Sequence, residues 1–242
     1  MKTNRHHIVL IILAFILSSC SVETIRVSAN DSIVTKEIST SNYSAIEIAN
    51  GFNAYVTFSD TEELVIIESN ENLDEFIIAK VKDGKLIVRL MNNINIKGQE
   101  TLNVYITTKS ITDFRVAADS KIYLENTLAT DNVKIKVTAD SFFSGAVQVD
   151  DLQLTVAADA KADLYGHANY LDARLSADAK LSDYDLDVDD LKLKMTADCK
   201  TDITVNHTIN IEALADCRLR YKGDAVIVHK DLRADSRIIK ID

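Results

Sequence analysis

The chain has 242 residues, 47% of them apolar, and a formal net charge of −10 at pH 7. A chain of that net charge lacks the overall basic surface that nucleic-acid phosphates require, so nucleic-acid binding is set aside. The sequence contains no proline, no tryptophan and only six glycines, and strand-forming residues dominate it. A chain of this size can bury a substantial core as one elongated domain, and a compact enzyme of helices and strands is disfavoured.

Residues 1–19 are typical of an export signal. Two basic residues, Lys2 and Arg5, precede the apolar run of residues 8–17, which is too short to span a bilayer and fits the hydrophobic region of a signal peptide. The run ends in Leu17-Ser18-Ser19-Cys20, which resembles a bacterial lipobox and implies lipidation of Cys20. The alternative is an ordinary signal peptide in which this cysteine is incidental.

Lipid chains on Cys20 would anchor the mature protein stably at a membrane surface, because several acyl chains hold where one is marginal. The next residue is Ser21, whereas retention at the inner membrane is associated with aspartate at this position. We therefore expect an outer-membrane lipoprotein that faces either the periplasm or the exterior. Residues 20–42 are polar and weakly patterned, and we expect them to form a tether.

From residue 43 to residue 108 the sequence predicts short strands, because apolar and polar residues alternate with the period of extended chain. The pair Asp83-Gly84 predicts a hairpin, since it supplies the positive φ angles of a two-residue turn. The expected strands cover residues 46–48, 54–58, 64–68, 76–82, 85–90 and 102–106.

The rest of the chain, residues 109–242, contains seven copies of an Ala-Asp motif whose aspartates lie 21, 19, 19, 20, 18 and 19 residues apart. A unit of about 20 residues cannot bury an apolar face except against its neighbours, so the period predicts a solenoid of stacked coils. The aspartates are Asp119, Asp140, Asp159, Asp178, Asp198, Asp216 and Asp235.

Each repeat alternates with period two, so the phase predicts which side chains point inward. We expect the Ala of each motif to point in, the Asp out, the following Ser, Ala or Cys in, and the next Lys or Arg out. The motif would then form a corner between two strands, where Asp suits the unusual backbone angles and can bond nearby amides. Parallel stacking would bring equivalent residues to about 4.8 Å from one another.

The row of seven aspartates admits three interpretations. It is a structural lattice with hydrogen bonds at the corners, a site for calcium or another cation, or a row that binds a ligand. Six of the seven motifs place Lys or Arg two positions after the Asp, which offsets repulsion between stacked carboxylates. Phe142 interrupts that basic row.

Several of these segments carry a resemblance to a known family. Tyr43, Ile46 and Gly51-Phe52-Asn53, followed by the segments 81–88 and 102–107, resemble the auto-transporter adhesin head GIN domain family over residues 42–240. The resemblance implies a right-handed parallel β-helix (β-solenoid) and often an exported lipoprotein. The repeat spacing predicts about 18–21 residues per coil. The family brings no catalytic residues and no cofactor. Its usual Ser-Gly corners are replaced here by Ala-Asp.

Cys199 and Cys217 occupy the same position in adjacent repeats, so their Cα atoms should lie about one strand spacing apart. That distance is within the range of a disulfide, and an exported protein meets oxidising conditions. Both residues point inward in the predicted phase, which favours buried free thiols instead. A metal site is the third alternative, although no histidine shares their position.

The segment Asp183 to Asp190 places carboxylates at alternate positions, hence on one face of a strand. Alternate residues diverge too far to share one cation unless the segment curls, so a solvated acidic strand is favoured over a cation site. The histidines His167, His207 and His229 show no metal-ligand spacing and are interpreted as surface residues.

The last six residues, 237–242, are strand-forming and have no recognisable polar cap. Solenoid ends need capping or pairing. The sequence therefore predicts either a homodimer through the C-terminal coil or an edge guarded by Arg237 and Lys240.

Taken together, the sequence predicts a non-catalytic adhesive or structural module with no cofactor and no resident metal. Its repeated faces suit a polysaccharide or a surface protein, and contacts would be multivalent. The alternative is a polysaccharide-active enzyme that uses the outward aspartates, for example Asp178, Asp198 and Asp216. Carboxylate spacing alone does not distinguish the two, because any acidic ladder provides the separation that glycoside hydrolysis requires.

Overall fold

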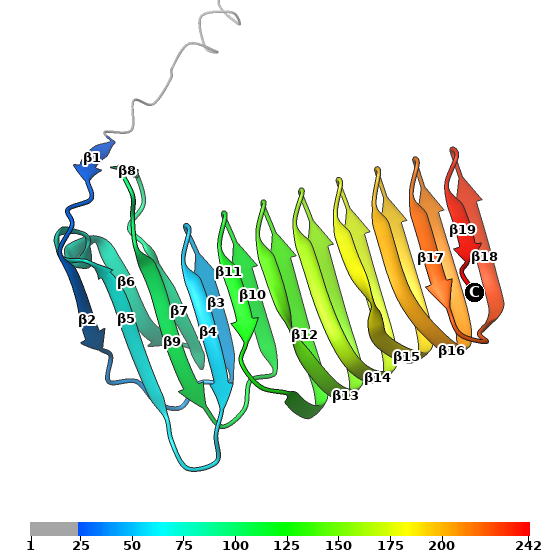
Figure 1. The fold of residues 1–242 in the computed structure, drawn as a ribbon, viewed down its shortest axis with the longest axis horizontal. Helices are drawn as coiled ribbons and strands as arrows, with labels where there is room; N and C mark the ends of the chain where they lie inside the picture. Colours follow the sequence, from blue (N-terminus) through cyan, green and yellow to red (C-terminus); the bar gives the residue numbers. More distant parts are fainter. Residues whose placement is uncertain (1–23) are drawn as a thin grey trace, which may run out of the picture.

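The computed structural model describes residues 24–242, with the exception of the side chain of Asp183. Its coils lie side by side along one axis and form a β-solenoid of about seven turns with about 19 residues per turn (Figure 1). The predicted solenoid is therefore confirmed. Seventeen of the described strands belong to one continuous sheet, and two more pair separately.

The middle of the solenoid consists of long strands that run along one face, bend, and return along the other. In β13 the first half pairs with β11 and the second half with β12, so the two halves belong to different faces. We call the face of the first halves face A and that of the second halves face B. The long strands are β12 (Leu128–Thr138), β13 (Phe142–Ala157), β14 (Lys161–Ser176), β15 (Lys180–Thr196) and β16 (Lys200–Leu214).

Coils toward either end use separate strands for the two faces. Face A contains β4 (Asn53–Phe58), β11 (Lys121–Leu124), β17 (Arg218–Lys222) and β19 (Arg237–Lys240), and face B contains β3 (Ala45–Ala49), β10 (Asp113–Ala117) and β18 (Val226–Arg233). The coil of β3 and β4 lies out of chain order, because β3 pairs with both β7 and β10 and β4 with both β9 and β11.

The N-terminal end of the solenoid is closed by antiparallel strands. The pairs β2–β5, β5–β9 and β6–β7 are antiparallel, and β1 and β8 form a separate two-stranded parallel sheet. The elements are β1 (Ile25–Ser28), β2 (Ile33–Glu37), β5 (Leu64–Asn70), the 3-10 helix η1 (Glu71–Phe76), β6 (Ile77–Lys82), β7 (Lys85–Leu90), β8 (Ile94–Lys97) and β9 (Leu102–Thr108).

This closure corrects one expectation and confirms another. The described part of the segment 20–42 is not a tether, because β2 hydrogen-bonds to β5 and so belongs to the sheet. Backbone pairing holds it there, together with the partly buried side chains of Val27, Ala29 and Ile38, which pack against the core. The predicted hairpin at Asp83-Gly84 is present as β6 and β7, with φ angles of 51° and 70° at the two turn residues.

The core lies between the two faces and is filled by the inward residues of both. Phe114 on face B meets Phe143 on face A edge to face, with ring centroids 5.3 Å apart, and both side chains are fully buried. Along the inward column of face A, Phe143 is followed by Ala162 and then Leu181 in the next coils. Such mixing of large and small residues fills an interior of limited width at high packing density.

On the edge where the long strands bend, some positions require glycine. A Cβ atom on Gly166 would lie 2.2 Å from the carbonyl oxygen of Val147, and its φ is +104°. Gly223 is in the same situation against Val205, at a φ of +90°. At these points the backbones of adjacent coils approach more closely than a side chain allows.

Candidate functional site

The Ala-Asp motifs form tight corners between face B and face A. In all seven motifs both residues have φ between 49° and 63°, which is the condition for a type I′ turn. Asp tolerates this left-handed conformation better than most residues, so its place at the corner has a backbone cause. The predicted inward direction of the Ala is wrong: these alanines are exposed or half-buried, because the left-handed turn carries them out of the strand phase.

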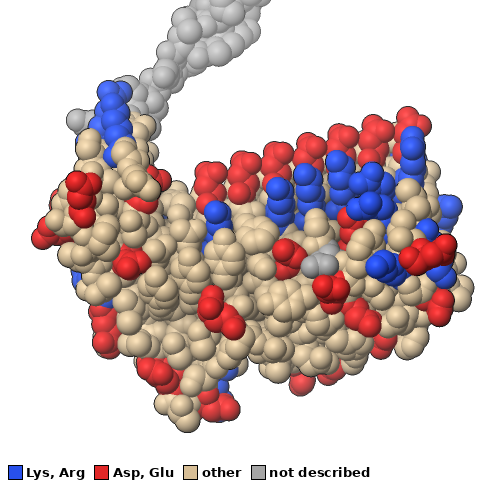
Figure 2. Space-filling view, in the orientation of Figure 1, with Lys and Arg blue, Asp and Glu red and all other residues tan. Residues whose placement is uncertain are grey.

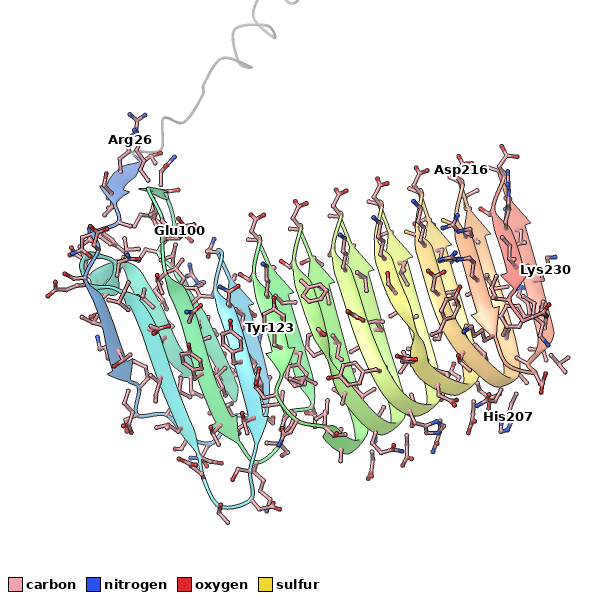
Figure 3. The ribbon with its side chains drawn as sticks, in the orientation of Figure 1. Arg26, Glu100, Tyr123, His207, Asp216 and Lys230 are labelled. Atoms are coloured by element: carbon pink, nitrogen blue, oxygen red, sulfur yellow. The ribbon has the colours of Figure 1, made fainter. Side chains whose placement is uncertain are left out.

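Hydrogen bonds between adjacent coils continue through the corners. The backbone N–H of Asp159 donates to the carbonyl of Ala177 at 2.9 Å, that of Asp178 to Ala197 at 3.0 Å, and that of Asp198 to Ala215 at 2.9 Å. The aspartates therefore stand in single file, as the repeat predicted. Figure 3 shows the row along the upper edge, with Asp216 labelled at the tip of its turn.

The seven aspartate side chains are all exposed, and none has a recorded hydrogen bond or ion pair to the described residues. The expected bonding of these carboxylates to corner amides is therefore absent. In residues 24–242 no group of three or more His, Cys, Asp or Glu side chains is arranged to hold a metal ion. The geometry of the described chain thus gives the cation interpretation of the row no support.

A column of cations runs beside the aspartate row on face A. Lys161, Lys180 and Lys200 are direct neighbours in adjacent coils, followed by Arg218 and Arg237. Figure 2 shows acidic tips along the upper edge with basic side chains directly below them. The acidic and basic rows expected from the sequence are therefore adjacent, but none of the recorded ion pairs joins them.

Many basic side chains outside this column form ion pairs. On face A Arg220 lies 2.5 Å from Asp202, and this partner raises the pKa of the Arg220 guanidinium. The pairs on face B are Lys85–Glu47, Arg115–Asp113, Arg174–Asp172, Lys192–Asp172, Lys194–Glu212 and Arg233–Asp231. These cations have carboxylate partners on their own face, whereas those beside the aspartate row have no ion pair to a described side chain.

A stack of tyrosines on face A is a feature that sequence reasoning missed. The ring of Tyr55 lies between those of Tyr105 and Tyr123, with centroid distances of 5.3 and 5.5 Å and interplanar angles of 15° and 17°. Phe142 extends the group at 5.8 Å from Tyr123. In its own strand, each tyrosine lies two residues after the residue that aligns with the basic column. This regularity becomes visible only once the spatial order of β9, β4 and β11 is known.

Polar side chains complete the stack at its N-terminal end. Asn53 donates to the Oδ1 of Asn103 at 3.2 Å, and Asn103 donates to the Oε2 of Glu68 at 2.7 Å. The hydroxyl of Tyr105 donates to the same Oε2 at 3.2 Å. Burial and the Glu68 carboxylate together raise the pKa of Tyr105. This end of the column therefore combines hydroxyl and amide groups with one carboxylate.

Cys199 and Cys217 are buried free thiols, one of the three states that the sequence left open. Each Sγ donates to a backbone carbonyl at 3.2 Å, of Thr196 and Leu214 respectively. Ser141 makes the same kind of bond in its own coil. Burial raises the pKa of Cys199 to about 11 and also raises that of Cys217, so the thiolate needed for metal binding or disulfide exchange is disfavoured.

The acidic segment of β15 is engaged by its neighbouring coils. The side chain of Asn206 donates to Asp187, and Thr208 donates to Asp190. His167 lies 3.7 Å from Asp187 and shares a hydrogen bond of 3.0 Å with Asn169. His207, labelled on the lower edge in Figure 3, and His229 are exposed. These contacts show that carboxylates of β15 interact with side chains of the adjacent coils.

The aspartates proposed for catalysis are poorly placed for it. Asp178, Asp198 and Asp216 are exposed residues of tight turns, whereas the electrostatic effect of catalytic carboxylates is stronger in a site that excludes water.

Among the residues described, no helix combines the length and hydrophobicity needed to cross a bilayer.

Comparison with a family model gives a match over residues 42–225, to the family described as "Putative auto-transporter adhesin, head GIN domain". A search of curated proteins gives no significant match.

Several solved structures share the fold. A protein from Bacteroides fragilis described as a putative adhesin has 18% identity and a TM-score of 0.77, with 88% of this chain and 99% of that chain covered. Another so described, from Parabacteroides merdae, has 17% identity and a TM-score of 0.71, covering 90% and 100%. A protein from Parabacteroides distasonis described as a putative lipid binding protein has 14% identity and a TM-score of 0.69, covering 90% and 100%. At these identities the likeness establishes the fold alone.

Proposed function

The chain belongs to the auto-transporter adhesin head GIN domain family, and from this membership we propose that it is a non-catalytic binding module of the bacterial cell envelope. Its ligand would be an extended polymer, either a glycan or a protein. The observation that carries the proposal is the regular column: equivalent positions recur from coil to coil on a surface held in register by backbone hydrogen bonds, and Lys or Arg follows six of the seven Ala-Asp motifs. A ligand that follows the solenoid axis would meet the same groups repeatedly.

Repetition matters because each exposed contact is weak. One exposed ion pair contributes roughly 0–1 kcal/mol, which cannot hold a partner alone. When contacts are linked along one polymer, the later ones form intramolecularly and the total affinity rises steeply. A rigid solenoid suits this mode because its contact groups are positioned before the ligand arrives.

The experiment measures binding and cleavage together. The mature protein is incubated with a panel of polysaccharides and envelope proteins, and both retention and product size are recorded. Retention of at least one polymer without cleavage is expected. Cleavage that is lost in Asp198→Asn would overturn the proposal in favour of a polysaccharide-active enzyme, and absence of any binding would overturn it outright.

We also propose attachment to the outer membrane through lipid on Cys20. Residues 1–19 and Cys20 lie outside the described residues, and the proposal is supported by the lipobox resemblance. The first described strand begins at Ile25, so the N-terminal end of the solenoid would be held within about 18 Å of the anchor.

The anchor is tested by substitution in the native host. Cys20→Ala should move the protein from the membrane fraction to the soluble fraction and abolish incorporation of labelled fatty acid. Digestion of intact cells by protease decides which side of the membrane it faces. Unchanged fractionation of the variant would exclude lipidation at this position.

A further inference from the structure

We propose that one outer column of face A binds a linear acidic polysaccharide, of the class whose sugars carry carboxylates, such as a polyuronate. This inference rests on the proposed function and names its ligand class. We call the column the track. It consists, in spatial order, of Asn103, Asn53, Lys121, Phe142, Lys161, Lys180, Lys200, Arg218 and Arg237.

Strand register makes the track straight and evenly spaced. Every adjacent pair in it is a direct pairing of parallel strands, so successive side chains are about 4.8 Å apart. An extended chain of pyranose sugars advances by a comparable length per residue. Successive sugars of such a polymer are rotated about the chain axis, so a uronate polymer lying along the track would present a carboxylate to every second or third cation.

The cations of the track are free to engage a ligand. None of its six basic side chains has a recorded ion pair to a side chain that the structure describes, whereas several cations of face B, such as Lys192 and Lys194, are paired. The Nε of Arg218 is buried and lacks a hydrogen-bond partner in the described chain. Ammonium and guanidinium groups bind carboxylates through charge-assisted hydrogen bonds, which are stronger than neutral ones.

Two further features distinguish a sugar polymer from a simple polyanion. Phe142 stands among the cations and packs against Tyr123 at 5.8 Å, which offers an apolar surface to the C–H face of a sugar. Asn53 and Asn103 lie at the N-terminal end of the track, where Asn103 also donates to the carboxylate of Glu68. Their remaining amide hydrogens and oxygens suit sugar hydroxyls. A polyphosphate has neither apolar faces nor multiple hydroxyls and could use only the cations.

The aspartate row limits the affinity. Its carboxylates stand one corner away from the cations, at the exposed tips of the turns, and repel an approaching polyanion. Repulsion between exposed charges is screened by salt, and so is the attraction to the cations. Replacing the tip carboxylates with amides should therefore tighten binding, although none of them belongs to the track.

The test compares three polymers on the mature protein: polygalacturonate or alginate as the uronate, a linear neutral glucan, and inorganic polyphosphate. The variant Lys161→Gln/Lys180→Gln/Lys200→Gln removes three cations from the track. The control variant Lys80→Gln/Lys134→Gln/Lys136→Gln removes the same charge from exposed positions of β6 and β12, outside the track. Circular dichroism and thermal unfolding verify that both variants fold.

We expect the unaltered protein to bind a uronate polymer and not the neutral glucan. The track variant should lose about tenfold in affinity, and the control variant should change by less than about twofold. Phe142→Ala should weaken binding of the uronate polymer but not of polyphosphate. Asp178→Asn/Asp198→Asn should strengthen uronate binding.

Three results would overturn the inference. They are failure of the protein to bind either uronate polymer, equal losses in the track and control variants, and polyphosphate binding as tight as uronate binding. After the first result the proposed function survives if another polymer of the panel is retained, and after the other two it survives because the protein still binds a polymer. It fails together with the inference only when the protein binds nothing.

Discussion

At the scale of single residues, Gly166 shows how closely the coils approach at the bend. Its φ of +104° and the 2.2 Å that would separate an added Cβ from the carbonyl of Val147 mean that Gly166→Ala must move backbone. We expect a loss of about 2–4 kcal/mol in the free energy of unfolding, measured by urea denaturation.

Gly84→Ala is the matched control. This glycine also has a positive φ, +70°, but nothing lies within 4 Å of an added Cβ. Its substitution should cost only the left-handed strain of alanine, about 1–2 kcal/mol. Equal losses of unfolding free energy in the two variants would mean that the close approach to Val147 adds nothing to the cost of a side chain at residue 166.

The buried thiol of Cys199 predicts a dependence on pH. Burial raises its pKa from 9.0 to about 11 in the folded protein, so the folded state holds the proton more tightly than the unfolded chain. The stabilisation is complete below pH 9 and is lost as pH rises from 9 toward 11. Alkylation of the native protein by iodoacetamide should accordingly be slow at pH 8 and accelerate near pH 11.

Two measurements check this assignment. In Cys199→Ser the hydroxyl can replace the thiol as donor, as Ser141 does in its own coil, and the contribution of Cys199 to the pH dependence should disappear. Unfolding without reductant should expose two alkylatable thiols, from Cys199 and Cys217. Finding none would mean that the pair is oxidised to a disulfide in the exported protein.

At the scale of the element, the corner carries residual strain. Ala177 and Asp178 have φ of 54° and 56°, and alanine in this region costs about 1–2 kcal/mol. The turn between β3 and β4 uses Asn50-Gly51 with φ of 64° and 82°, the pair that type I′ turns prefer. Replacing Ala177-Asp178 with Asn-Gly should therefore stabilise the protein by about 1 kcal/mol and raise the Tm by about 2–4 °C.

The reverse exchange is the control for the corner. Changing Asn50-Gly51 to Ala-Asp should lower the Tm by a similar amount, measured by the same thermal scan. An unchanged or lower Tm after the Asn-Gly exchange at Ala177-Asp178 would indicate that the exposed alanine makes a favourable contact that the Asn-Gly turn lacks.

How far the sequence predicts these elements depends on whether a signal is local. The 20-residue period and the turn pair Asp83-Gly84 can both be read along the chain without knowing which distant segments pair, and both predictions are confirmed. The placement of β2 beside β5 and of β4 between β9 and β11 depends on pairing between distant segments, which periodicity does not encode. For the same reason the basic row could be read from the sequence, whereas the stack of Tyr105, Tyr55 and Tyr123 could not.

At the scale of the whole molecule, the two ends of the solenoid differ. Antiparallel strands close the N-terminal end, while β18 and β19 leave an open edge, with Val226 65% and Val228 61% exposed. Lys230 is in register with the buried Ile211, and Lys240 with the buried Tyr221. Figure 3 shows Lys230 at the C-terminal end. Charged residues at core-facing positions of an edge discourage pairing with another chain.

We therefore expect Lys230→Val/Lys240→Val to self-associate in sedimentation velocity at concentrations where the unaltered chain remains monomeric. Lys134→Val/Lys136→Val, with the same change of charge in the middle of face B, should remain monomeric. A dimer of the unaltered chain that dissociates when the C-terminal coil is altered would establish the homodimer that the sequence left open.

The out-of-order coil of β3 and β4 has a consequence for how such a molecule can lengthen during evolution. On its C-terminal side, chain order and spatial order agree, so duplication of one repeat would insert one complete coil and leave the cross-section of the solenoid unchanged. On its other side the strands pair out of chain order, and a duplicated segment would have no unpaired strand edge to bind. Genes of this kind should therefore vary in repeat number toward the C-terminus, and the reach of the protein would change there in steps of one coil.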